Sequence, residues 1–178
     1  IMGPLAALVL ACIFFALRTD RFLTGANFSL ILQQVMVVGI LAIGQTLVIL
    51  TAGIDLSNGS VMALGGVLMT SLAAQYGVHP VLAVLLGIGV CLLFGVINGA
   101  LVTGIRLPAF IVTLGTLNIA YALTRIYTTS TITNLPDAML FFGNTFSIGE
   151  TQITYGSVLM LILYAITWFV LRSTPAGR

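Results

Sequence analysis

The sequence contains no lysine, and this absence excludes one large class of function. The phosphate-binding loop of ATPases and GTPases needs a lysine next to a serine or threonine, because the lysine contacts the β- and γ-phosphates. This chain cannot form that loop, so any ATP hydrolysis that drives it must occur on another polypeptide. We therefore expect no enzyme active site, no catalytic residues and no cofactor in this chain.

Charged residues of either sign are scarce. Only 6% of the residues are charged, while 60% are hydrophobic and the mean hydropathy is +1.20. A soluble domain carries about 25% charged residues, so this composition indicates a protein whose solvent is the lipid bilayer. The net charge of +2 comes from a few scattered arginines, which is too little for a nucleic-acid-binding face.

Cysteine and histidine are too few for a disulfide framework or a metal site. Cys12 and Cys91 both lie inside apolar runs, so we interpret them as small packing residues. His79 is the single histidine and offers no metal-ligating cluster. The first residues enter apolar sequence without the basic flank of a signal peptide, so we expect a truncated N-terminus.

Long apolar runs separated by short polar breaks dominate the chain. About 20 residues of helix cross a bilayer core of about 30 Å, so the runs predict membrane spans. The predicted fold is an all-α, polytopic membrane helix bundle with six transmembrane helices. They are expected at about 2–17, 33–52, 58–75, 80–103, 109–127 and 153–171.

Two polar segments are expected outside these spans. Residues 22–32 are predicted to form an interfacial connection, since threonine, glycine, asparagine and serine alternate there with aromatics. Residues 128–152 are predicted to form the one sizeable extramembrane segment, with a short surface helix at residues 139–142.

The polar break between the second and third runs, residues 51–60, contains the only carboxylate between Arg21 and Arg106. A charged Asp55 in such apolar sequence needs backbone donors, water or a partner. The side chain of Ser57 or Asn58 is expected to cap the following helix. We favour a local structural role for this break over direct contact with a substrate or ion; its residues are Gly53, Asp55, Ser57, Asn58 and Gly59.

The depth of the break has two interpretations. It can be a turn at the cytoplasmic surface, or a re-entrant or discontinuous-helix feature at membrane depth. The sequence alone does not separate them.

Amide side chains within the runs are costly in lipid and are expected to face protein or water. The candidates for lining a pathway or contacting a substrate are Gln33, Gln34, Gln45, Asn98 and Asn118. For Asn98 we favour a hydrogen bond between helices over contact with a solute. Threonines at helical spacing in the fifth run, including Thr113 and Thr116, can bond to their own preceding turn and need not line a pathway.

Small residues recur every fourth position in the run 80–103. This spacing places them on one helix face and predicts close helix packing. The residues assigned to this packing role are Gly87, Gly95 and Gly99, with Cys91 between them.

Several ordered motifs resemble one known family. The string from Gly44 to Ser57, closed by Gly59-Ser60, resembles the signature region of the ribose/xylose/galactose-type permeases of bacterial ABC importers. Other matching segments follow in order, and the resemblance covers nearly the whole chain. They are Asn98-Gly99, Pro108 to Gly115, and Arg172 followed by Gly177-Arg178.

The resemblance also implies a fold, a location and partner proteins for this chain. Such permeases have about ten membrane helices, dimerise and lie in the bacterial inner membrane. They work with two partners, a cytoplasmic ATPase that binds ATP and magnesium and an extracytoplasmic sugar-binding protein. Residues 1–178 would then be the N-terminal part of a single transmembrane domain, with the coupling loop beyond Arg178. Arginine counts on the two sides tie, but the resemblance places Arg106 and residues 172–178 in the cytoplasm and residues 128–152 outside.

The resulting hypothesis is a permease subunit of an ATP-driven monosaccharide importer, whose translocation pathway forms between two chains. An alternative is an ion-coupled secondary transporter in which Asp55 carries a proton or binds sodium. A third is a structural membrane subunit whose polar residues only pack helices. The sequence does not identify the sugar.

Overall fold

The computed structural model describes residues 2–149 and 151–174, so the Gly177 and Arg178 of the resemblance lie outside the described residues. The chain divides into two compact units. Unit 1 comprises Ile1–Ile40 and Phe142–Arg178, and unit 2 comprises Leu41–Phe141.

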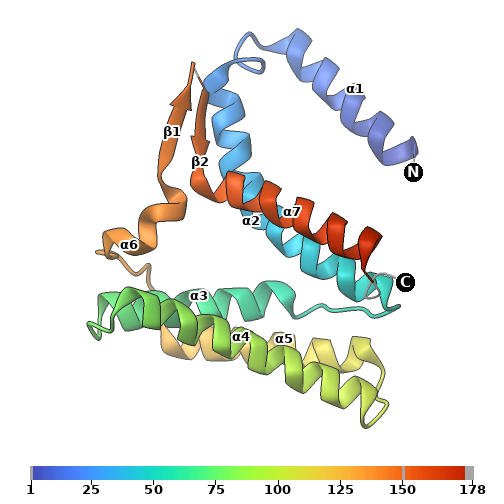
Figure 1. Ribbon diagram of the computed structural model, residues 1–178, viewed down its shortest axis with the longest axis vertical. Coiled ribbons are helices and arrows are strands. Elements are labelled where there is room, and N and C mark those ends of the chain that lie inside the picture. Colours follow the sequence, from blue (N-terminus) through green and yellow to red (C-terminus); the bar gives the residue numbers. More distant parts are fainter. Residues whose placement is uncertain (1, 150, 175–178) are drawn as a thin grey trace. The chain divides into compact units, whose positions relative to one another are not determined.

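Seven α-helices, one 3-10 turn and one hairpin make up the described chain (Figure 1). In order they are α1 (Met2–Arg18), α2 (Gly25–Leu50), α3 (Asn58–Ala74), α4 (Pro80–Thr103), α5 (Ala109–Tyr127), α6 (Asp137–Leu140), the 3-10 turn η1 (Phe141–Gly143), β1 (Thr145–Ile148), β2 (Thr151–Thr154) and α7 (Tyr155–Ser173).

Four of the described helices, α2, α4, α5 and α7, are long and apolar enough to cross a membrane. The helices α1 and α3 are apolar too, but each has only 17 residues. At 1.5 Å per residue they extend about 25 Å, less than the bilayer core of about 30 Å. The membrane helix bundle is thus present, while the predicted number of six spanning helices is not matched.

The start of α2 corrects the expected connection at residues 22–32. The helix begins at Gly25, because the polar side chains there bond within the local turn instead of interrupting it. The Oγ of Ser29 donates to the Gly25 carbonyl at 2.8 Å, and the Nδ2 of Asn27 donates to the Phe22 carbonyl at 2.8 Å.

The hairpin was not predicted and makes the chain not strictly all-α. Strands β1 and β2 pair antiparallel, with Thr145 opposite Thr154 and Ile148 opposite Thr151. Threonine, isoleucine and phenylalanine favour strands, and Gly149 supplies the positive φ of 62° that the tight turn needs. The short helix expected at residues 139–142 is present as the end of α6 and the 3-10 turn.

In unit 1, α7 and β2 pack on the first half of α2 (Figure 1). The backbone N–H of Gln152 donates to Ser29 Oγ at 2.7 Å, and Ser157 Oγ donates to the Leu32 carbonyl at 3.2 Å. Two methionine–glycine contacts bring the helices close: Met160 lies over Gly39, and Met36 lies over Gly156.

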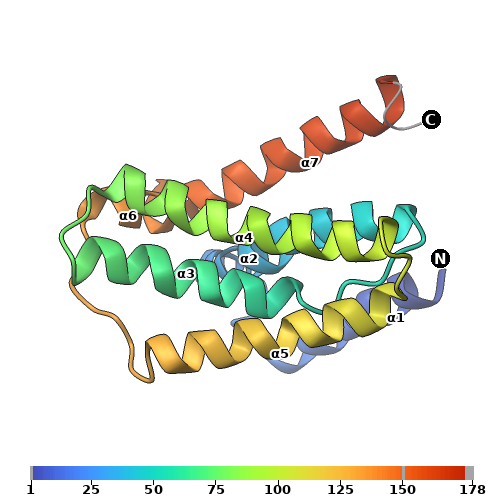
Figure 2. The same ribbon diagram turned by 90° about the horizontal axis from the view of Figure 1, so that it is seen from below.

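In unit 2, α3, α4 and α5 form a three-helix group (Figure 2). Val61, Leu64 and Ala120 are buried at its centre. The helices α3 and α4 meet backbone to backbone, since a Cβ on Gly87 would lie 2.8 Å from the Gly65 carbonyl oxygen.

The predicted glycine stripe therefore serves helix packing only in part. Gly87 is buried against α3. Gly95 and Gly99 are exposed, and a Cβ added to either would meet nothing within 4 Å. Within unit 2, only Gly87 of the three therefore makes a close helix contact, and packing at Gly95 and Gly99 stays a prediction.

Candidate functional site

The break after α2 begins with a hydrogen-bonded helix end. The Gly53 N–H donates to the Val48 carbonyl at 3.0 Å and the Ala52 N–H donates to the Ile49 carbonyl at 2.9 Å, the two bonds of a Schellman motif. The residue in the left-handed position is Ala52, with φ of 58°, where glycine is usual. An alanine there is strained, because its Cβ crowds the following carbonyl.

Replacing Ala52 by glycine is expected to raise the free energy of unfolding by about 0.5–1 kcal/mol, since relief of left-handed strain exceeds the added entropy of glycine. The measurement is thermal or denaturant unfolding of the full-length chain in detergent. Ala42→Gly, inside α2, is the matched control and should lower stability by about 0.5–1 kcal/mol. Equal losses at both positions would contradict the strain at Ala52.

Asp55 and Ser57 form a closed local pair. The Oδ1 of Asp55 accepts the Ser57 N–H at 2.8 Å and the Ser57 hydroxyl at 2.6 Å. Ser57 occupies the N-cap of α3, but neither its side chain nor that of Asn58 caps the helix. The predicted capping is wrong, because the Ser57 hydroxyl is engaged by Asp55 and by a neighbouring helix.

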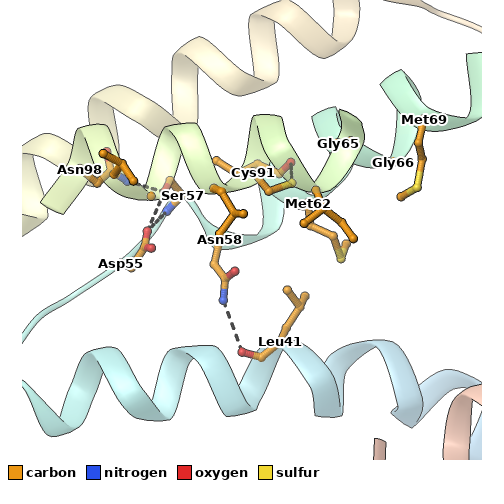
Figure 3. A pocket seen from close by; sticks show the side chains of 16 residues that line it. Leu41, Asp55, Ser57, Asn58, Met62, Gly65, Gly66, Met69, Cys91 and Asn98 are labelled. Carbon is orange, nitrogen blue, oxygen red and sulfur yellow. Dashed lines mark hydrogen bonds between the residues drawn. The ribbon is translucent and has the colours of Figure 1, made fainter. Parts of the chain in front are cut away.

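Asn98 links this pair to both neighbouring helices. Its Nδ2 donates to Ser57 Oγ at 3.1 Å, while its Oδ1 accepts the hydroxyl of Thr116 from α5 (Figure 3 shows the first of these bonds). Thr113, also on α5, donates to the Ile54 carbonyl at 3.2 Å. Ser57, Asn98 and Thr116 are all buried. The interpretation of Asn98 as a bridge between helices agrees with these bonds.

The break lies beside the bodies of α4 and α5 rather than at their ends. Asn98 precedes the last residue of α4, Thr103, by five residues, or about 7 Å. Thr113 follows the first residue of α5, Ala109, by four residues, or about 6 Å. Ile54 and Ser57 of the break therefore bond to α5 and α4 about one helical turn inside the ends of these helices.

A groove of about 590 Å³ opens along α3 and α4 beside the break. Its walls are mainly apolar, and its polar groups gather at one end (Figure 3). The polar residues are Asp55, Ser57, Asn58 and Asn98; the others are Leu41, Val61, Met62, Gly65, Gly66, Met69, Gly87, Ile88, Cys91, Leu92, Gly95 and Val96.

Of the five predicted pathway residues, only Asn98 lines this groove. Gln33 and Gln45 are half-buried and Gln34 is exposed, all on α2. Asn118 is exposed, and its Nδ2 donates to the Leu114 carbonyl of its own helix at 2.8 Å. Within unit 2, Gln45 and Asn118 are therefore not part of the lining to which Asn98 belongs.

The side chains that bond to the break from α5 were not predicted from the sequence. Thr113 and Thr116 do bond to their own helix, as expected, but they also reach Ile54 and Asn98. Their spacing of three residues, which places both on one face of α5, was the available signal.

The break carries a carboxylate without a cation. Within residues 2–149 and 151–174, no ion pair involves Asp55, and no group of three or more histidine, cysteine or acidic residues gathers to hold a metal. The site is thus a set of hydrogen-bonding groups at one end of an apolar groove.

Comparisons with known proteins agree on a transport role. Residues 27–178 match the family model described as "Branched-chain amino acid transport system / permease component". The chain is 44% identical to the fructose import permease protein FrcC of Rhizobium meliloti, over 98% of this chain and 51% of that protein. It is 37% identical to the ribose import permease protein RbsC of Bacillus subtilis, over 99% of this chain and 55% of that protein.

A third relative differs in its cargo. The chain is 33% identical to the autoinducer 2 import system permease protein LsrC of Photorhabdus laumondii, over 97% of this chain and 52% of that protein. The chain spans about half the length of these curated relatives. No solved structure gave a significant match.

Proposed function

The chain belongs to the family of permease components described for branched-chain amino acid transport systems, and on this premise we propose that it is a membrane subunit of an ATP-driven bacterial importer of monosaccharides. The observation that carries the proposal is the identity of 44% and 37% to a fructose and a ribose import permease over nearly the whole chain. The four helices that are long and apolar enough to cross a membrane support a multi-pass location in the inner membrane.

The proposed assembly contains six crossings in this part of the chain. The helices α1 and α3 would be the fifth and sixth, with α3 extended by the non-helical residues 53–57, which would make up its missing length. In the complete protein, about ten helices from each of two chains would enclose the pathway.

The division of labour between subunits follows from the chemistry of this chain. ATP and magnesium would bind a cytoplasmic ATPase subunit, and residues 1–178, which contain no lysine, cannot supply a phosphate-binding loop themselves. An extracytoplasmic sugar-binding protein would supply affinity. The permease then needs only weak polar contacts along its pathway, and Gln33, Gln34, Gln45 and Asn118 stay candidates for them, while the amide of Asn98 is committed to Ser57 and Thr116.

The test is uptake into vesicles that hold the full-length chain, its ATPase and its binding protein, with and without internal ATP. The labelled solutes are ribose, fructose, other pentoses and hexoses, leucine and autoinducer 2, which cover the cargo named for the family and its relatives. We expect ATP-dependent uptake of one monosaccharide, and no uptake when the lysine of the ATPase phosphate-binding loop is replaced.

Two results would contradict the proposal. Uptake that persists without ATP and stops when the proton or sodium gradient is collapsed would show an ion-coupled transporter and would direct attention to Asp55. ATP-dependent uptake of leucine or autoinducer 2 alone would retain the importer and refute the sugar.

A further inference from the structure

We propose that the polar end of the α3–α4 groove, formed by Asp55 and Asn58, is a weak binding site that accepts hydrogen bonds from sugar hydroxyls as the solute passes. This inference rests on the proposed function, because it names a contact point for the transported solute. It concerns residues of the break for which the sequence favoured a local structural role over direct contact with a substrate or ion.

The first support is the depth of the break. If α4 and α5 cross the membrane, residues 54–57 lie about 6–8 Å inside their ends, because Ile54 bonds to Thr113 and Ser57 bonds to Asn98. Non-helical backbone at membrane depth occurs only where it is buried in protein or lines a water-filled cavity. The groove lies beside these residues, and in transporters polar solutes bind next to broken helices.

The second support is that two oxygen acceptors at this end are free. The Oδ1 of Asp55 accepts both bonds from Ser57, whereas no residue in the described ranges donates to its Oδ2. The Nδ2 of Asn58 makes a long bond of 3.4 Å to the Leu41 carbonyl, and its Oδ1 has no donor among the described residues. Both side chains line the groove (Figure 3).

These acceptors suit a solute that donates hydrogen bonds rather than an apolar one. Sugar hydroxyls donate to carboxylate and amide oxygens, and a charged acceptor forms the stronger bond. The fixed Oδ1 holds the Asp55 carboxylate in one orientation before a solute arrives. Among the described residues, no group of three or more histidine, cysteine or acidic side chains gathers that could hold a metal ion.

The rest of the groove provides space and an apolar wall. A Cβ added to Gly66 or Gly95 would meet nothing within 4 Å, so backbone is open to the groove on both α3 and α4. Met62 and Leu92 also line it and can contact the C–H face of a sugar ring. The volume of about 590 Å³ lies within the range of about 300–1,000 Å³ for small-molecule sites.

The experiment uses a cysteine in the groove as a reporter of sugar occupancy. Gly95→Cys is made in the full-length chain with Cys12→Ser and Cys91→Ala, and the rate of modification by a small charged methanethiosulfonate is measured in vesicles with and without millimolar ribose or fructose. Gly99→Cys is the matched control, since it lies four residues away on α4, is equally open, and does not line the groove. A second reporter is the native Cys91, used in the Cys12→Ser chain.

We expect the transported sugar, but not a non-transported sugar, to slow modification of Gly95→Cys severalfold, with no effect on Gly99→Cys. Adding Asp55→Asn, which keeps Oδ1 as an acceptor for Ser57, should remove most of the protection, and so should Asn58→Ala. Protection that survives both substitutions would overturn the proposal. The proposal would also be overturned if the charged reagent modified neither Gly95→Cys nor the native Cys91, because the groove would then be closed to polar solutes.

The uptake assay separates the two levels of inference. ATP-dependent sugar uptake without sugar protection at Gly95→Cys would refute the groove site and leave the proposed function intact. Absence of sugar uptake by the unmodified complex would refute the proposed function.

Discussion

Replacing Gly87 by alanine is expected to lower the free energy of unfolding by about 1–3 kcal/mol, the usual cost of overpacking a close contact. The added Cβ would lie 2.8 Å from the Gly65 carbonyl oxygen and 2.9 Å from the Met69 Cβ. Neither neighbour is the far end of a flexible side chain, so α3 and α4 must move apart. The measurement is unfolding of the purified full-length chain in detergent.

Gly89→Ala is the matched control on the same helix. A Cβ there meets nothing within 4 Å, so the substitution should be neutral or should gain up to about 1 kcal/mol from helix propensity. The prediction is therefore a difference in sign between two glycines two residues apart. Equal effects at Gly87 and Gly89 would show that α3 and α4 do not meet at Gly87.

Asn98→Leu is expected to lower the free energy of unfolding by about 1–3 kcal/mol, because it breaks two buried hydrogen bonds at once. Ser57 Oγ would lose its donor and the Thr116 hydroxyl would lose its second acceptor. Asn118→Leu is the control, since the exposed Asn118 bonds only within α5. It should change stability by less than about 0.5 kcal/mol.

A double substitution tests whether the hydrogen bond between Thr116 and Asn98 accounts for the stability lost in Asn98→Leu. Thr116→Val removes the partner hydroxyl and nearly keeps the side-chain shape. The losses from Asn98→Leu and Thr116→Val should then be less than additive, by about 0.5–1.5 kcal/mol. Strict additivity would mean that the link between α4 and α5 contributes nothing to stability.

The helices themselves were largely predictable, because their signals are local. The run predicted at 80–103 has the same bounds as α4, which begins at Pro80 where a missing N–H is harmless. The run predicted at 109–127 has the bounds of α5, which begins directly after Pro108. Composition also identified the membrane as the solvent.

The site was less predictable, because its bonds join residues far apart in sequence. A serine side chain at an N-cap normally accepts a hydrogen bond from the first turn of its helix. Here Ser57 Oγ instead accepts from Asn98 Nδ2, which lies 41 residues away in sequence. The four-residue spacing of small residues in 80–103 places Gly87, Gly95 and Gly99 on the same face of α4. It therefore does not indicate which of these glycines contacts α3. Likewise Met36 and Met160 carried no signal that each would lie over a glycine.

Unit 1 is formed by two stretches of chain that are far apart in sequence, so it can assemble only late in synthesis. Ser29 meets its partner Gln152 only after 123 further residues have been added. At about 5–20 residues per second the ribosome needs roughly 6–25 s for this interval. Unit 2 is contiguous and can be completed within that time, whereas the first half of α2 must wait in the membrane with Gly39 uncovered until α7 emerges. A chain that ends before residue 155 would therefore have all three helices of unit 2 but would lack the partner of the first half of α2.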